Sequence, residues 1–536
     1  MAEIYQNIIV GSGPGAVIAA QTLVEAGQEV LMLDFGNIDN HYSSIVPQGN
    51  FNTLRQSDEN QGKYFLGNNL EAVPSPEITT GAQLTPSRKH IIEGTKKWCP
   101  VISQNFFPME SLALGGLGAG WGLGTYVYSD SELLKVGLDI SQMKLAYNEV
   151  AERIGISAGN DDVSNYIIGD LKNLQKPLTP DNSVKLMLDK YQKNKNKLNK
   201  SGIYFGLPSM ALLTEDFDGR KATNYSDLDF YTDKNKSAWR PVFVIEKLIQ
   251  NPNFRYLAGK YVMKFTQEKD VISIESIRVD TKVKELFLCK KLLLGAGALG
   301  SAKIALRSLK IQKLPLLCNP YTYLPAINIS MLNKSLTEKK TSMAQAMLIY
   351  DEDGKNSDLV SVAVFTYKSL LLMRLIQQSP LNIADNRIIF KWLQSAFVIA
   401  GIHHPDEYNE NKSMELTQDK NSETGDSLKV NFEITDTEYS KIKLKEKSIK
   451  RALRKMGVYP IKRLDPGFGS SIHYGGTLPF SNNDNLGTTD SSGKIHGTNN
   501  VYVVDGSSFK YLPAKGITFS IMANSHRIAK LLIENG

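Results

Sequence analysis

The feature that most constrains the fold of this chain is a strand, a glycine turn and a helix at its N-terminus. The apolar residues 8–10 lead into Gly11, Gly13 and Ala16, which match the dinucleotide-binding pattern G-x-G-x-x-A. Glycine permits a tight turn and lets the backbone approach phosphates, which the N-terminus of the following helix also attracts. Asp34 ends the next apolar strand, where it could accept hydrogen bonds from ribose hydroxyls. These residues predict a β-α-β unit that binds a dinucleotide, although any tight β-α-β turn would also need small residues.

The C-terminal segment has the pattern of the rest of the same domain. The apolar residues 501–504 precede Asp505 and Gly506, and a closing helix is expected over residues 521–533. A nucleotide-binding fold that only its C-terminal segment completes is typical of FAD proteins rather than of NAD proteins. We therefore expect FAD as the cofactor, and an NAD-dependent dehydrogenase is the weaker alternative.

Length and composition indicate a globular protein of two domains. The 536 residues exceed what one hydrophobic core usually supports, and 42% hydrophobic with 22% charged residues is ordinary for a soluble chain. The net charge of +7, from 62 basic and 55 acidic residues, is most simply a solvated surface, with an anionic partner or a membrane as the alternative. We expect no nucleic-acid partner.

The cysteines and the N-terminus favour a cytoplasmic location. Cys99, Cys289 and Cys318 fit neither a disulfide framework nor a zinc site, so we expect a reducing compartment and no metal. The first strand begins too close to Met1 to leave room for a signal peptide, and no run of 18 apolar residues predicts a membrane span.

Further patterns divide the chain into three parts. Residues 1–312 are expected to form the first part of the cofactor domain, with irregular excursions at about 36–110 and 160–240. Residues 313–463 mix extended and helical segments and predict an α+β substrate domain, and residues 464–536 complete the cofactor domain. Strands are predicted at 254–257, 261–265, 272–279, 284–289, 291–294, 344–350, 360–367, 396–402 and 428–434.

Two local patterns give predictions that depend on single residues. Helical periodicity over residues 141–154 predicts a helix with Ser141 as its N-cap. The polar segment from Asp406 to Gly425 predicts an exposed loop or hairpin tip.

Two further glycine-rich stretches are candidates for ligand contact. Glycine occupies positions 115, 116, 118, 120, 122 and 124, and such a backbone suits a surface pressed against a flat ligand or a phosphate. Trp121 in its middle argues against the alternative, a mobile linker. Residues 295–301 repeat the strand, glycine turn and helix, and taken alone they fit a ligand site or a plain connection equally well.

His473 is the candidate catalytic base. It stands just before the pair Gly475-Gly476, in a chain with only seven histidines. An imidazole can take the proton of an alcohol because its pKa lies near working pH. A structural role for His473 is the alternative that the residue alone leaves open.

Together these motifs resemble those of the glucose–methanol–choline (GMC) family of FAD-dependent oxidoreductases. The resemblance covers residues 8–34, the glycine stretch from Gly115, residues 292–306 and residues 473–532, in the family's order. It implies a discontinuous, Rossmann-like α/β FAD domain that carries an α+β substrate domain with an antiparallel sheet. The residues that would contact FAD by this resemblance are Gly11, Gly13, Gly15, Ala16, Asp34, Gly115, Gly116, Gly118, Ala119, Trp121, Val262, Gly295, Ala296, Asp505, Gly506 and Ile517.

The resemblance also implies a mechanism and shows two departures from it. In this family a histidine takes the proton of the substrate hydroxyl while a hydride moves to flavin N5, and His473 falls at that position. Gly516 stands where the family usually has a second histidine or an asparagine, so Lys515 or a water would have to replace that hydrogen bond. Gly120 stands where some relatives carry a flavin-linking histidine, which implies non-covalent FAD.

The implied function is the oxidation of an alcohol, such as a sugar hydroxyl, with oxygen, a quinone or a protein as the electron acceptor. A flavin-binding protein of the same fold with a weakly active or inactive alcohol site is the alternative, because of Gly516. The apolar residues 367–378 and 389–393 have basic residues beside them. They could contact a membrane, or more simply form a core helix of the substrate domain.

Overall fold

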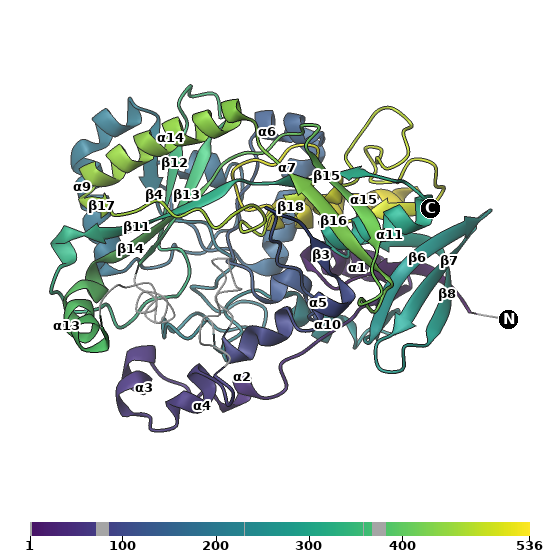
Figure 1. Cartoon of the computed structure of the whole chain (residues 1–536), viewed down its shortest axis with the longest axis horizontal. Coiled ribbons are helices and arrows are strands. Elements are labelled where there is room, and N and C mark those ends of the chain that lie inside the picture. Colours follow the sequence, from purple (N-terminus) through teal and green to yellow (C-terminus); the bar gives the residue numbers. More distant parts are fainter. Residues whose placement is uncertain (1–2, 71–84, 230, 357, 367–381, 536) are drawn as a thin grey trace.

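The computed structural model describes residues 3–70, 85–229, 231–356, 358–366 and 382–535. It contains a seven-stranded, a six-stranded and a four-stranded sheet, with a two-stranded one between them (Figure 1). In Figure 1 the six-stranded sheet lies toward the left of the molecule, and the hairpin strands of the seven-stranded sheet lie at its right edge.

The seven-stranded sheet is built around a parallel core. Its strands are β1 (Ile4–Val10), β2 (Val30–Leu33), β5 (Phe254–Leu257), β6 (Lys260–Glu268), β7 (Val271–Arg278), β8 (Lys284–Leu294) and β19 (Val501–Val503). β5, β2, β1 and β8 pair parallel in that order, and β2 is buried along its whole length, as expected for a parallel sheet covered on both faces. β8 is a single strand where two were predicted. Its first half pairs antiparallel with β7, and its last three residues pair parallel with β19.

The two ends of the chain meet in this sheet, as predicted. The helices involved are α1 (Pro14–Glu25), α7 (Ile140–Ile154) and α15 (Thr518–Glu534). α1 packs along α15, and a Cβ at Gly15 would lie 2.1 Å from the carbonyl oxygen of Val504, so only glycine fits there. Thr22 of α1 lies 2.7 Å from Nδ1 of His526 of α15, whose Nε2 lies 2.5 Å from a carboxylate oxygen of Glu149 of α7. The expected β-α-β unit and the C-terminal strand and helix therefore form one domain.

The six-stranded sheet is antiparallel and separates a core from a cavity. Its strands, in order, are β17 (Val458–Pro460), β11 (Tyr321–Asn328), β14 (Phe397–His403), β13 (Val360–Thr366), β12 (Ala346–Tyr350) and β4 (Ile203–Gly206). α9 (Asn182–Asn199) and α14 (Asp436–Lys455) lie along one face (Figure 1). On β11, β12, β13 and β14 the residues of even number, such as Leu324, Val362 and Ala400, form the core on that side. Because side chains alternate along a strand, the odd-numbered residues face the other way.

Two strands or pairs of strands belong to another sheet than the predicted division into domains implies. The domain boundaries at 312/313 and 463/464 themselves stay predictions. β4 lies within the predicted excursion 160–240 but forms an edge of the six-stranded sheet. The second difference concerns the four-stranded sheet of β3 (Val101–Ile102), β16 (Asp426–Phe432), β15 (Lys412–Gln418) and β9 (Leu314–Pro315). β15 and β16 belong by sequence to the predicted substrate domain, yet Met414, Leu428 and Phe432 pack with the core of the seven-stranded sheet.

Two local predictions are wrong about the residues at which a helix and a polar segment begin. α7 has Asp139, not Ser141, as its N-cap, because the Asp139 side chain accepts a hydrogen bond from the backbone N–H of Gln142. The segment from Asp406 to Gly425 is only partly exposed. Asp406 and Lys412 are buried and paired at 2.6 Å, which offsets the cost of burying both charges. The turn between β15 and β16 forms the exposed hairpin tip that was predicted, and Glu407, Glu410 and Asn411 are exposed as well.

The remaining helices surround these sheets. They are α2 (Tyr42–Ile45), α3 (Phe51–Ser57), α4 (Gln61–Phe65), α5 (Thr95–Trp98), α6 (Asp130–Val136), α8 (Ser164–Ile167), α10 (Pro241–Leu248), α11 (Ala298–Leu309) and α13 (Ile383–Leu393). Of the two segments considered for membrane contact, 367–378 lies outside the described residues, and 389–393 lies in α13, where Ile389 and Trp392 are exposed. Within the described ranges, no helix combines the length and the apolar character that crossing a membrane requires.

Candidate active site

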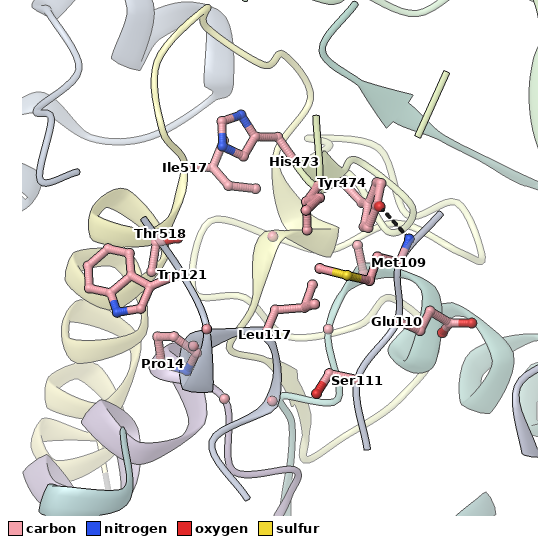
Figure 2. Close-up of a pocket in the computed structure, with 18 of the residues that line it drawn as sticks. Pro14, Met109, Glu110, Ser111, Leu117, Trp121, His473, Tyr474, Ile517 and Thr518 are labelled. Carbon is pink, nitrogen blue, oxygen red and sulfur yellow. Dashed lines mark hydrogen bonds between the residues drawn. The ribbon is translucent and has the colours of Figure 1, made fainter. Parts of the chain in front are cut away.

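A cavity of about 570 Å³ lies between the carboxyl ends of the parallel strands and the odd-numbered face of the six-stranded sheet. Glycine turns form one end, and side chains of β11, β13 and β14 form the other. Figure 2 shows His473 and Ile517 above the glycine stretch that carries Leu117 and Trp121. Ligands of open α/β sheets bind at the carboxyl ends of the strands, so this is the expected place for a cofactor.

The two glycine turns after β1 and β8 lie against each other. Gly11 has φ of +92°, and a Cβ there would lie 2.5 Å from the carbonyl oxygen of Gly295. A Cβ at Gly295 would in turn lie 2.8 Å from the Cβ of Ala16, so Ala16 packs α1 against the second turn and does not line the cavity. Gly13, Gly295 and Ala296 do line it. The position of the second turn thus favours the ligand interpretation over a plain connection.

The glycine stretch is ordered and joined to the first turn. It forms the short helix η2 (Gly116–Ala119), and Gly115 donates its backbone N–H to the Ser12 hydroxyl at 2.8 Å. Ser12 donates in turn to Asp34 at 2.5 Å. Trp121 donates its indole N–H to the carbonyl of Trp239 at 3.1 Å. The predicted cofactor residues of this stretch divide into Gly116, Gly118 and Trp121, which line the cavity, and Gly115 and Ala119, which do not.

Two buried carboxylates lie at the glycine end of the cavity. Asp34 accepts hydrogen bonds from Ser12 and from the Tyr256 hydroxyl at 3.0 Å, and burial raises its pKa to about 6 despite these bonds. Asp505 accepts from the Ser301 hydroxyl at 2.6 Å and from the backbone N–H of Ser507 at 2.9 Å, and burial raises its pKa as well. Both carboxylates line the cavity. The same is true of the predicted contacts Gly15, Val262, Gly506 and Ile517.

His473 lines the cavity with its ring held in one orientation. Its Nδ1 lies 3.2 Å from Oδ1 of Asn319. The Asn319 amide nitrogen donates to the carbonyls of His404, Leu512 and Pro513 at 2.8, 3.3 and 3.1 Å, so Oδ1 must be the acceptor toward His473. Nδ1 of His473 therefore carries the proton, and Nε2 keeps a free lone pair. Burial lowers the pKa of His473 to about 4, which keeps the ring neutral at working pH.

His403 is a second histidine of the site, which the sequence did not indicate. Its ring stacks on that of His473, with centroids 4.8 Å apart and planes 21° apart, and the centroid of the Tyr321 ring lies 4.6 Å from its own. Burial, and then the neighbouring His473 and His404, keep the pKa of His403 well below its usual value. His404 faces the opposite side of the sheet, where it lies 3.9 Å from Glu446. Because side chains alternate along a strand, the sequence could have predicted that these two histidines lie on opposite faces of the sheet. It could not have predicted which of the two faces the cavity.

The structure contradicts the prediction that Lys515 replaces the missing second donor. Its ammonium group is buried and donates to Glu132 at 2.6 Å and to the carbonyl of Val127 at 3.1 Å, outside the cavity lining. Gly516 does line the cavity, and a Cβ there would meet Tyr126 at 3.5 Å. The C-terminal segment therefore offers no side-chain donor at this position.

Comparison with known proteins bears on these features. Residues 426–525 match a family model described as GMC oxidoreductase. The resemblance to the GMC family is confirmed. Pyridoxine 4-oxidase from Mesorbium loti is a similar solved structure, with a TM-score of 0.56 and 15% sequence identity over 98% of this chain and 99% of that one. At this identity the likeness to a solved GMC-type oxidase shows the fold alone. No curated protein sequence matches the chain. The family match supports an oxidoreductase.

Proposed function

We propose that this GMC-type protein is an FAD-dependent oxidoreductase that oxidises an alcohol, with His473 as the base. The observation that carries the proposal is the neutral His473 ring, whose free Nε2 belongs to a cavity that continues to the glycine turns. A base of this kind is useful only where a ligand brings a proton to it.

The residues present fit FAD. The contact between Gly11 and Gly295 leaves backbone rather than side chains at the cavity wall, which suits the close approach of a pyrophosphate. Asp34 keeps a carboxylate at the end of β2, where ribose hydroxyls are bound in such folds. A Cβ at Gly120 would lie 2.7 Å from Ile91, and no side chain there can link a flavin, which supports non-covalent binding. Bound there, FAD would supply the acceptor for the hydride of the alcohol carbon.

The chain's own residues would handle the proton. Nε2 of His473 accepts the proton of the substrate hydroxyl as the hydride leaves the neighbouring carbon, so the alcohol becomes an aldehyde or ketone. The imidazolium that forms keeps its Nδ1–H on Asn319, which holds the ring in place during the transfer. Side chains of the six-stranded sheet line this end of the cavity.

The alternative is a flavin-binding protein whose alcohol site is weak or inactive, and Gly516 is the feature that motivates it. One hydrogen bond to the reacting oxygen is worth about 1–1.5 kcal/mol, so its loss alone would slow the reaction roughly tenfold and not abolish it. His403, which faces the same space as His473, offers a different donor. The electron acceptor can be oxygen, a quinone or a protein.

The test is the visible spectrum of the purified protein, recorded anaerobically before and after addition of alcohols and sugars. We expect a flavin spectrum that is bleached by at least one compound, and His473→Ala should slow the bleaching at least about a hundredfold. His41→Ala is the matched control, because His41 is exposed and lies outside the cavity lining. A colourless protein that takes up no FAD, or unchanged reduction in His473→Ala, would overturn the proposal.

A further inference from the structure

We propose that the cavity takes an uncharged alcohol with a flat, apolar body, which lies on the six-stranded sheet while His403 and His473 hold its oxygen. This inference rests on the proposed function and names its substrate class. It departs from the expectation of a sugar hydroxyl.

The sheet presents a flat apolar surface to the cavity. Three rows of paired residues cross β11, β14 and β13, and all of them face the cavity side. Pro325, Ile399 and Phe365 form one row, Tyr323, Gly401 and Ala363 form the next, and Tyr321, His403 and Ser361 form the third. All of these residues but Gly401 line the cavity. An aliphatic or aromatic body can replace water on this surface at a gain of about 25 cal/mol per Å² of apolar area.

Aromatic rings line part of the cavity beside this surface. A Cβ at Gly401 would lie 2.6 Å from the Tyr321 hydroxyl, so the glycine lets the Tyr321 side chain lie across the strand. The rings of Tyr321, His403 and His473 then follow one another, with planes 40° and 21° apart. A planar group fits beside such a series of rings better than a puckered one, because aromatic rings gain most from offset stacking or edge contacts.

Among the residues that the structure describes, the sheet side of the cavity carries no charged side chain. The charged side chains of the lining are Asp34, Arg88, Glu110, Lys260 and Asp505, and none of them lies on β11, β12, β13 or β14. A charged group on the substrate would lose its water without gaining a partner, at a cost of several kcal/mol. A choline-like cation or a carboxylate is therefore excluded from this surface.

A sugar is also a poor fit, since each of its hydroxyls would need a hydrogen-bond partner once buried. Ser361 is the hydroxyl of β13 in the lining, and it already donates to the carbonyl of Ala514. The phenol groups of Tyr321 and Tyr323 are the remaining hydroxyls that β11 contributes. The described residues of the sheet thus offer two further hydroxyls, fewer than the five of a hexose.

His403 provides the second contact to the substrate oxygen. Within the described part of the chain, its two ring nitrogens have no hydrogen-bond partner, although the ring lines the cavity. As a neutral imidazole it offers one N–H donor, whereas Nε2 of His473 accepts. The pair thus supplies the donor that Gly516 cannot.

Ligand binding to the FAD-loaded protein tests the substrate class without depending on turnover. We would measure Kd by saturation-transfer NMR for benzyl alcohol, 4-(hydroxymethyl)benzoate and D-glucose. Benzyl alcohol should bind at least about tenfold more tightly than the other two. Equal or tighter binding of the benzoate or of glucose, or no binding of benzyl alcohol, would overturn the inference.

A charge placed on the sheet should reverse this preference. Ile399→Lys adds a cation to the apolar row, and we expect the Kd ratio of the two aromatic alcohols to shift at least about tenfold toward the benzoate. Ile461→Lys is the matched control, because Ile461 is exposed and lies outside the lining. An unchanged ratio in Ile399→Lys would show that the ring does not lie on this surface.

The role of His403 is tested by comparing benzyl alcohol with ethylbenzene, which has a methyl group in place of the hydroxyl. In His403→Leu the preference for benzyl alcohol over ethylbenzene, measured as the ratio of their Kd values, should fall by about tenfold, which corresponds to one hydrogen bond. His403→Gln should retain part of that preference. The same ratio in the wild-type protein and in both variants would remove His403 from the site. Failure of the proposed function would look different, because the protein would then take up no FAD or His473→Ala would be reduced normally.

Discussion

Oδ1 of Asn319 accepts the Nδ1–H of His473 at 3.2 Å, while the amide nitrogen of the same Asn319 is bound to carbonyls of two other segments. The backbone carbonyl groups that accept from the Asn319 amide nitrogen fix the orientation of the amide, and the amide oxygen in turn fixes the tautomer of His473. His404 directly follows β14 of the six-stranded sheet and Leu512 lies in the C-terminal segment, so both parts of the molecule take part in orienting the base.

Asn319→Ala should slow alcohol-dependent flavin reduction by about tenfold or more, because His473 can then adopt the unproductive tautomer. Stopped-flow reduction, normalised to folded protein, measures this. Ser471→Ala is the control, since the Ser471 hydroxyl contacts the backbone N–H of His473 at 3.4 Å and not its ring. Equal rates in the two variants would contradict the orienting role of Asn319.

The pH dependence of the reaction should reflect the buried base. Burial lowers the pKa of His473 to about 4, and the base must be neutral to accept a proton, so the rate of flavin reduction should stay level as pH falls through 6.5. It should decline only near pH 4. The sign follows from burial, which disfavours the charged form. Rapid pH-jump reduction measurements would show this, and a midpoint near 6.5 would mean that the ring is solvated.

The buried pair of Lys515 and Glu132 should matter for stability and not for catalysis. Lys515→Met leaves the Glu132 carboxylate buried without its partner, and we expect the free energy of unfolding to fall by about 3–5 kcal/mol in denaturant titrations. Adding Glu132→Gln should recover much of that loss, because the amide can still accept from Ser129. A more than tenfold slower reduction by folded Lys515→Met would restore a catalytic role for Lys515.

Gly15→Ala should separate the two ends of the chain. The added Cβ would lie 2.1 Å from the Val504 carbonyl, so α1 must move away from the segment after β19, and we expect a loss of about 3 kcal/mol or more. Gly62→Ala is the matched control, because a Cβ there meets no atom within 4 Å and alanine favours the helix. Comparable thermal midpoints for the two variants would contradict the close packing at Gly15.

The parts of this structure that sequence predicts well are those governed by local patterns. The turn at Gly11, the strand that ends at Asp34 and the helix that closes the chain follow from periodicity and from the conformational freedom of glycine. His473 was indicated by its neighbours Gly475 and Gly476 as well as by its family position. Its place in the cavity agrees with that prediction, while its chemical role stays a proposal.

What sequence could not provide depends on pairing between distant strands and on buried partners. His403 joins the site only because β14 pairs with β11 in a register that sets it opposite Tyr321. Lys515 lies outside the cavity lining because its ammonium group pairs with Glu132, which is far away in the sequence. The N-cap of α7 was misplaced by two residues, because Asp139 and Ser141 are both good caps and only the backbone geometry decides between them.

The strand order of the seven-stranded sheet has a consequence for synthesis on the ribosome. β1 and β2 emerge first, yet β8 and β19, which complete their sheet, and α15, which covers α1, are translated much later. At about 5–20 residues per second this interval lasts roughly half a minute or longer. During it the N-terminal β-α-β unit lacks β8 and β19, which complete its sheet, and α15, which covers α1, so the apolar surface that they bury must be protected by chaperones or by temporary contacts. A chain released before its last strand would be a substrate for degradation.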